Sequence, residues 1–183
     1  MAYIMYSGKM VSDQIDAYLT NGVAETDLKD GYLVALGDLA TDTTYDPQGA
    51  LTHGVEYDVY EADVPAAATD EVGIIDYAGI SEGEINGNEY KIGKKLFDLT
   101  IPAGTNFRVR RLNLHDKFWL GASNFVAAPT VGEFATATAN DGRFTAAQTA
   151  PQAGLAVKVL VEKDLTTGMR SNGKMYLVEV VQL

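Results

Sequence analysis

The chain of 183 residues contains no cysteine and only two histidines, His53 and His115. The absence of cysteine excludes a disulfide framework, a thiolate nucleophile and cysteine-ligated zinc or iron–sulfur sites. Neither histidine has a second one at the spacing that lets two imidazoles share a metal ion. A histidine-based metal site is therefore not expected.

Motifs for catalysis and cofactor binding are scarce. There is no phosphate-binding loop and no Gly-x-Gly-x-x-Gly fingerprint. His115 and Asp116 resemble a base with its orienting carboxylate, but adjacent residues of a strand point to opposite faces. Asp38, Asp42 and Asp46 could surround calcium, but their spacing differs from the alternating ligands of an EF-hand loop. The sequence predicts a protein that is not an enzyme and has no cofactor or metal.

Long apolar runs and a basic, apolar leader are missing as well. The sequence predicts a protein made in a cytoplasm, without a membrane partner. The net charge of −11 argues against binding nucleic acid through the general surface.

Basic residues are few in the first 75 positions, where only Lys9 and Lys29 occur. Half of the 14 Lys and Arg residues fall between positions 91 and 117, and we call this set the basic strip. Its members are Lys91, Lys94, Lys95, Arg108, Arg110, Arg111 and Lys117. The strip has two interpretations, an internally paired face of a sheet or a docking site for an acidic partner.

Short runs with a period of two, separated by Gly, Asn, Asp and Pro, predict β-strands from position 31 onward. The clearest of them cover 32–36, 55–61, 72–77 and 88–92, and two more lie at 155–161 and 176–181. Leu155, Val157, Val159 and Val161 are expected on one face of their strand. Asn172-Gly173 is a candidate hairpin turn between the last two strands, which should lie centrally in a sheet.

The segment from Lys94 to Leu112 predicts a hairpin around a loop at 102–106. In this register Ile101 lies opposite Phe107, and Arg108 and Arg110 point away from the core. Trp119 is expected in the core or as an interface anchor.

Two segments do not fit the strand pattern. Residues 1–30 predict an N-terminal arm that is extended or forms one short helix starting at Ser12 or Asp13. Residues 127–153 are rich in Ala and Thr and predict a long surface loop. The fold class is all-β, an antiparallel β-barrel or β-sandwich, with one domain over 31–183.

Six strings carry a resemblance to a known family. They are 31–37 (GYLVALG), 56–60 (EYDVY), 70–76 (DEVGIID), 87–93 (GNEYKIG), 109–120 (VRRLNLHDKFWL) and 176–181 (YLVEVV). Together they resemble auxiliary head proteins of tailed bacteriophages, known as decoration or cement proteins. The resemblance implies a β-rich virion protein that binds the outside of the major capsid protein lattice and stabilises it.

The partner expected from this resemblance is the major capsid protein, and a homo-oligomer, with a trimer favoured, is expected for the chain itself. Lys94, Arg108, Arg110 and Trp119 are the candidate partner-binding residues. Two alternatives remain open. One is a tail-tube or tail-associated β-rich subunit, and the other is a carbohydrate-binding β-domain that uses Tyr60, Trp119 or Tyr176 for stacking.

Overall fold

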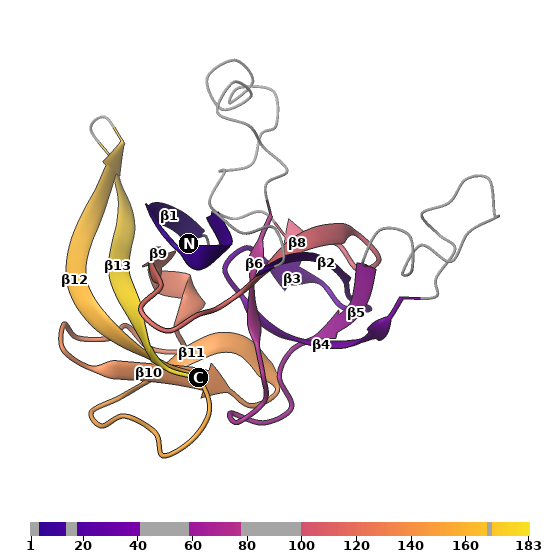
Figure 1. The fold of residues 1–183 in the computed structure, drawn as a ribbon. Coiled ribbons are helices and arrows are strands. Elements are labelled where there is room, and N and C mark those ends of the chain that lie inside the picture. The colour runs from indigo at the N-terminus through magenta and orange to yellow at the C-terminus, as the bar shows by residue number, and fades with distance from the viewer. Residues whose placement is uncertain (1–3, 14–17, 41–58, 78–99, 168–169) are drawn as a thin grey trace.

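The computed structural model describes residues 4–13, 18–40, 59–77, 100–167 and 170–183, and these residues form an all-β fold (Figure 1). The predicted fold class is thereby confirmed. In the described part of the chain, no helix is long and apolar enough to cross a membrane.

The larger sheet has six antiparallel strands in the order β1-β9-β13-β12-β10-β11. Their bounds are β1 Ile4–Lys9, β9 Lys117–Gly121, β10 Phe134–Thr138, β11 Asp141–Ala147, β12 Ala156–Thr167 and β13 Arg170–Gln182. The last two strands are the longest and lie in the middle of the sheet, as their sequence predicts.

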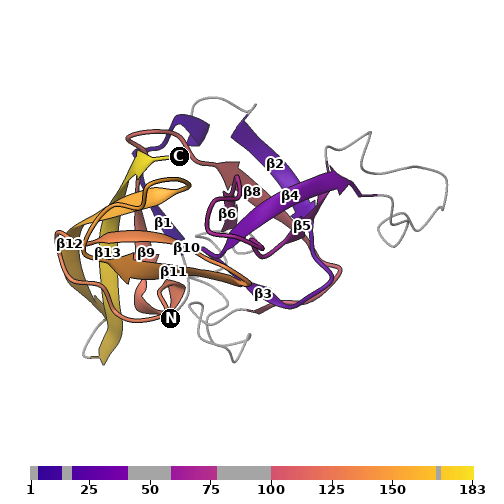
Figure 2. The same ribbon diagram turned by 90° about the horizontal axis from the view of Figure 1, so that it is seen from below.

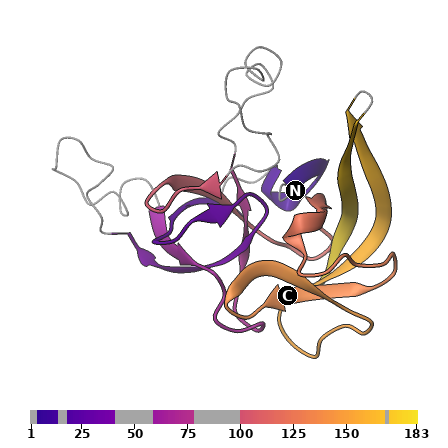
Figure 3. The same cartoon turned by 180° about the vertical axis from the view of Figure 1, so that it is seen from behind.

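Five further strands close into a barrel in the order β2-β5-β4-β6-β8, beside the sheet (Figures 2 and 3). Their bounds are β2 Leu19–Val23, β4 Leu33–Leu39, β5 Val59–Asp63, β6 Gly73–Asp76 and β8 Asn106–Arg111. The pairing of β2 with β5 is parallel, whereas the other pairings of the barrel are antiparallel. A small sheet pairs β3, Leu28–Lys29, with β7, Thr100–Ile101.

Two apolar clusters hold these layers together. One fills the barrel and includes Val34 and Ile75, and the other lies between the barrel and the six-stranded sheet and includes Leu33 and Ile74. Neighbouring residues of β4 and β6 therefore enter different clusters, since successive side chains of a strand alternate in direction. This two-sided burial explains why both strands are continuous apolar runs in the sequence.

The N-terminal residues are not an arm, because β1 and β2 belong to the large sheet and the barrel. Strand β1 pairs with β9 at the edge of the large sheet, and β2 closes the barrel between β5 and β8. At the predicted helix start, Val11–Asp13 form a 3-10 turn, η1, and positions 14–17, over which the expected helix would run, lie outside the described residues. Because β9 and β8, the antiparallel partners of β1 and β2, lie about a hundred positions further along the chain, and β5 about 40, local pattern could not reveal these pairings.

The expected hairpin over 94–112 is also wrong where the structure describes it. A turn does form after Ile101, with the Thr105 amide donating to the Pro102 carbonyl at 3.0 Å. The two flanking strands then diverge, because Ile101 pairs with Leu28 and Phe107 pairs with Gly22. The first part of the segment, with Lys94, lies outside the described residues.

Residues 127–153 contain two strands, β10 and β11, where a surface loop was predicted. Ala135, Ala137 and Phe144 are buried in the cluster below the sheet. This cluster lies between the six-stranded sheet and the barrel, where small side chains such as alanine let β10 and β11 lie close to the barrel. The composition was therefore a sign of close packing.

Asn172-Gly173 is not the turn of the last hairpin. Both residues lie inside β13, beside a register shift between Asp164 and Thr166, and Gly173 has φ of +105°. A left-handed glycine at a register shift is typical of a β-bulge. Thr167 at the end of β12 already pairs with Arg170 at the start of β13, and positions 168–169 lie outside the described residues.

Candidate interaction surface

A compact ion cluster on the barrel accounts for two of the candidate docking residues. Asp76 is 6% exposed, and its Oδ2 accepts from Arg110 Nε at 2.9 Å and forms an ion pair with Arg108. The Arg110 guanidinium also donates to Ser12 Oγ at 3.1 Å. Two guanidinium groups thus share one carboxylate next to the N-terminal segment.

The predicted outward direction of Arg110 is therefore corrected. Phe107 and Val109 do point into the barrel, so the alternation is as expected, but the opposite side of β8 is covered and leaves Arg110 only 6% exposed. A buried, paired guanidinium cannot meet a partner without a large desolvation cost. Arg108 is about a third exposed and already paired with Asp76. Lys94 lies outside the described residues.

Lys117, the last residue of the basic strip, lies on the other sheet. Its Nζ is 3.5 Å from Glu179 Oε2, and His115 Nδ1 is 3.1 Å from Glu179 Oε1. The hydrogen bond from His115 and the nearby Lys117 lower the pKa of Glu179 below its usual value. For Arg108, Arg110 and Lys117 the structure favours the internally paired interpretation of the strip.

His115 and Asp116 do not act as a pair. The His115 side chain is 74% exposed, whereas Asp116 is buried and accepts from the Val11 and Asn113 amides at 2.8 and 2.9 Å. Asp116 therefore ties η1 to the turn before β9. His53 lies outside the described residues.

Trp119 lies on the face of the six-stranded sheet that points away from the core, and we call this the outer face. Its neighbours Phe118 and Leu120 are fully buried, whereas Trp119 is half-buried. Across the sheet, Trp119 pairs with Leu177, and Leu177 pairs with Val161. Directly opposed residues of an antiparallel sheet share a face, so these side chains form one apolar row.

Val161 was predicted on the inner face, and this expectation is wrong. The pairing shifts between Val159, opposite Val178, and Val161, opposite Leu177, so Leu160 is an extra residue in β12. Such a bulge reverses the direction of the side chains that follow it. Val161 is consequently 44% exposed.

A second row on the outer face is charged. Lys117 pairs with Glu179, Glu179 with Lys158, and Lys158 with Phe134, whose ring centroid is 5.8 Å from Lys158 Nζ. The two rows lie side by side along the strands. Neither row could be predicted from the spacing of residues in the sequence, because their members come from four strands.

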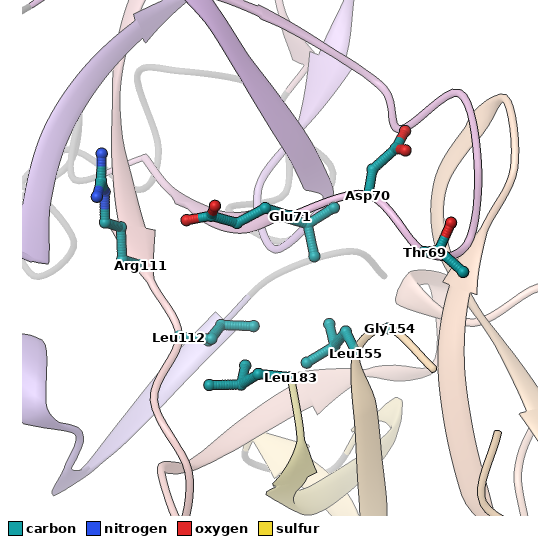
Figure 4. A pocket seen from close by; sticks show the side chains of 9 residues that line it. Thr69, Asp70, Glu71, Arg111, Leu112, Gly154, Leu155 and Leu183 are labelled. Atoms are coloured by element: carbon teal, nitrogen blue, oxygen red, sulfur yellow. The ribbon is translucent and has the colours of Figure 1, made fainter. Parts of the chain in front are cut away.

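A groove lies where the barrel meets the end of the large sheet (Figure 4). Two adjoining hollows of about 370 and 150 Å³ share Glu71, Val72 and Arg111 as lining residues. The leucines 112, 155 and 183 line one side, and the Glu71 side chain extends on the side of Arg111 (Figure 4). Within the described residues Arg111 has no ion pair. The groove could hold a small amphipathic group, but its lining offers no base and nucleophile in contact.

Two other expectations concern metal and sugar binding. Among the described residues, no group of three or more His, Asp or Glu side chains could hold a metal ion. Asp38 is exposed at the end of β4, and Asp42 and Asp46 lie outside the described residues. Tyr176 is 1% exposed and packs edge-on against Phe125, with ring centroids 5.4 Å apart, so it cannot serve as a stacking platform.

One motif needs its structural context. Residues 79–83 (GISEG) match the Gly-x-Ser-x-Gly pattern and lie outside the described residues. In hydrolases this pattern forms a tight turn between a strand and a helix of an α/β sheet. Here the preceding strand, β6, belongs to a closed barrel in an all-β fold, which weighs against that use.

Comparison with known proteins gives no relative. No family model, no curated protein and no solved structure matches the chain. Function is therefore inferred from the sequence and the geometry alone.

Proposed function

We propose that the chain is a structural protein of a tailed-bacteriophage virion, which binds the outside of the major capsid protein lattice and stabilises the head. The resemblance of the sequence to decoration proteins suggests this role. Its support in the structure is one feature, the hairpin arm, which comprises residues 160–167 of β12 and 170–174 of β13.

The hairpin arm extends past its neighbours in the sheet (Figure 1). Strand β10 pairs with β12 only as far as Lys158, and β9 pairs with β13 only from Met175 onward. Among the described residues, the arm therefore has backbone partners only within itself. Its outer edges carry N–H and C=O groups that another chain can pair with.

Four side chains of the arm that the structure describes are also accessible to a partner. Val161, Glu162, Lys163 and Asp164 are all exposed, and Glu162 forms an ion pair with Lys174 across the two strands. An isolated two-stranded ribbon is marginally stable in water. Packing against a neighbouring surface would therefore stabilise the arm. A capsid lattice provides such surfaces at many equivalent positions.

On a repeated lattice, each single contact can also have a low affinity. When subunits of an oligomer bind together, the second contact forms at a high effective concentration. The expected trimer would profit in this way, with each hairpin arm reaching a neighbouring subunit or the shell. An acidic remaining surface keeps the unbound protein soluble.

The test is the composition of purified virions. Virions of the phage that encodes the chain would be separated into heads and tails, and the chain quantified in each fraction by mass spectrometry. We expect it in the head fraction, in a fixed ratio to the major capsid protein. Absence from virions would refute a structural role altogether.

The second candidate is a tail-tube or tail-associated subunit, since a projecting hairpin can equally link neighbouring subunits of a ring. Sedimentation velocity of the purified chain separates the two candidates. A decoration protein should remain a monomer or small oligomer at micromolar concentration, whereas a tube subunit should form rings or longer assemblies. Recovery in the tail fraction would favour the tube subunit.

A further inference from the structure

We infer that the outer face of the six-stranded sheet is the surface that contacts the capsid. The site that it binds on the capsid protein is an apolar patch surrounded by carboxylates. This inference rests on the proposed function. It names the face and the chemistry of the partner, and it moves the contact away from the basic strip.

The centre of this surface is the apolar row of Trp119, Leu177 and Val161. The three residues belong to β9, β13 and β12 and are directly opposed in the ladder. None of them belongs to the two core clusters, although the residues on either side of Trp119 do. Met175, the next position along this face, is buried and adds no exposed area. A contiguous row with a tryptophan is typical of the energetic centre of a protein interface.

Lysines surround this row. Lys117 and Lys158 lie in the charged row on one side, and Lys163 lies on the other side, opposite Met175. Lys158 and Lys163 are exposed. The one carboxylate between them, Glu179, is engaged by His115 and Lys117. The outer face is thus locally positive on a protein whose net charge is −11.

The acidic residues of the hairpin arm do not alter this balance. Glu162 pairs with Tyr176, a core residue, and Asp164 pairs with Lys174. Both carboxylates therefore point to the inner side of the sheet, and Glu162 and Asp164 both raise the pKa of Tyr176, an effect second to burial of the phenol. On the hairpin arm, the two carboxylates thus lie on the inner side together with Lys174, whereas Lys163 lies on the outer face.

This charge pattern selects among partners. A second copy would bring lysines against lysines around the paired rows, which is unfavourable. Nucleic acid and anionic membranes would meet a protein that is strongly acidic elsewhere. A protein patch with an apolar centre and an acidic rim complements both rows at once.

The experiment measures binding of the purified full-length chain to expanded heads that lack it, by co-sedimentation at low and high ionic strength. Trp119→Ala should weaken binding by about 30-fold, as expected for a central tryptophan. The double reversal Lys158→Glu with Lys163→Glu should weaken it by about tenfold at low ionic strength, and by less at high ionic strength.

The matched control is Lys29→Glu with Arg111→Glu, which makes the same change in net charge away from the outer face. It should bind like the wild type. Circular dichroism confirms folding of each variant, and the exposed lysines keep the test valid if Trp119→Ala fails to fold.

The outcomes separate the two proposals. If the wild type does not bind heads, the proposed function fails. If the wild type binds and the outer-face variants bind equally well, the inference fails while the proposed function stands. Self-association that is lost in Trp119→Ala, or binding to anionic vesicles or DNA, would overturn the assignment of an acidic protein partner.

Discussion

Strand β6 of the barrel and strand β9 of the large sheet are both rich in apolar residues, but they use them differently. All four residues of β6 are buried, with Ile74 and Ile75 in separate clusters. In β9, Phe118 is buried and Trp119 lies half-exposed on the outer face. A strand buried on both sides holds the fold together, whereas a strand buried on one side leaves its second face for a partner.

The largest expected effect separates the two sides of β9. Phe118→Ala removes a fully buried ring and should lower the free energy of unfolding by about 4 kcal/mol. Trp119→Ala should cost about 1 kcal/mol, since much of the indole already contacts water. Urea denaturation of both variants measures the contrast. Equal losses would mean that Trp119 belongs to the core.

The ion cluster of the barrel should give the next largest effect. Asp76→Ala removes the carboxylate that accepts from the buried Arg110 Nε and should cost about 3 kcal/mol. The control, Asp38→Ala, changes an exposed carboxylate at the end of β4 and should stay within about 0.5 kcal/mol. A neutral result for Asp76→Ala in chemical denaturation would show that the cluster is solvated.

Strand positions could be predicted from the sequence, whereas the pairing of the strands could not. The all-β class and the strands around Leu33 and Ile74 follow from short apolar and alternating runs, and the central place of the last two strands follows from apolar residues on both of their faces. Pairing between distant strands does not follow from alternation. The buried Arg110, for example, donates a hydrogen bond to Ser12, 98 positions away in the chain.

The candidate site was predictable only in one residue. Trp119 could be singled out because it is the only tryptophan, but its direction required the position of the core. Lys158 lies among apolar residues of its strand and Lys163 lies between Glu162 and Asp164, so neither residue marked a basic surface in the sequence. A bulge of one residue at Leu160 decides where Val161 points, and the sequence around it carries no glycine to mark it.

Two-sided burial in β6 can be tested with small changes. Ile74→Val and Ile75→Val each remove one methylene from a fully buried site and should each cost about 1 kcal/mol. The residues face different clusters, so the effects should add in the double variant. Thermal unfolding measured by calorimetry checks this. A cost for only one of them would mean that one side of β6 is open.

The smallest effect concerns pH. Arg143 donates to Asp141 Oδ1 at 3.0 Å, and this hydrogen bond lowers the pKa of the Asp141 carboxyl in the folded protein. A lowered folded-state pKa stabilises above the unfolded value, near 4, and the stabilisation is lost as the pH falls through the folded value. Because both side chains are partly exposed, Asp141→Asn should cost less than about 1 kcal/mol at pH 7. Denaturation curves at pH 7 and pH 3 should show the difference shrinking in acid, and a growing difference would contradict the assignment.

The central claim is that the barrel stabilises the protein while the outer face of the sheet meets the capsid. Cryo-electron microscopy of virions tests it most directly, because it shows where the chain lies and which side it turns to the shell. We predict density outside the capsid with Trp119 and Lys158 at the contact and the barrel facing away. Density with the barrel against the shell and the outer face in solvent would contradict the account.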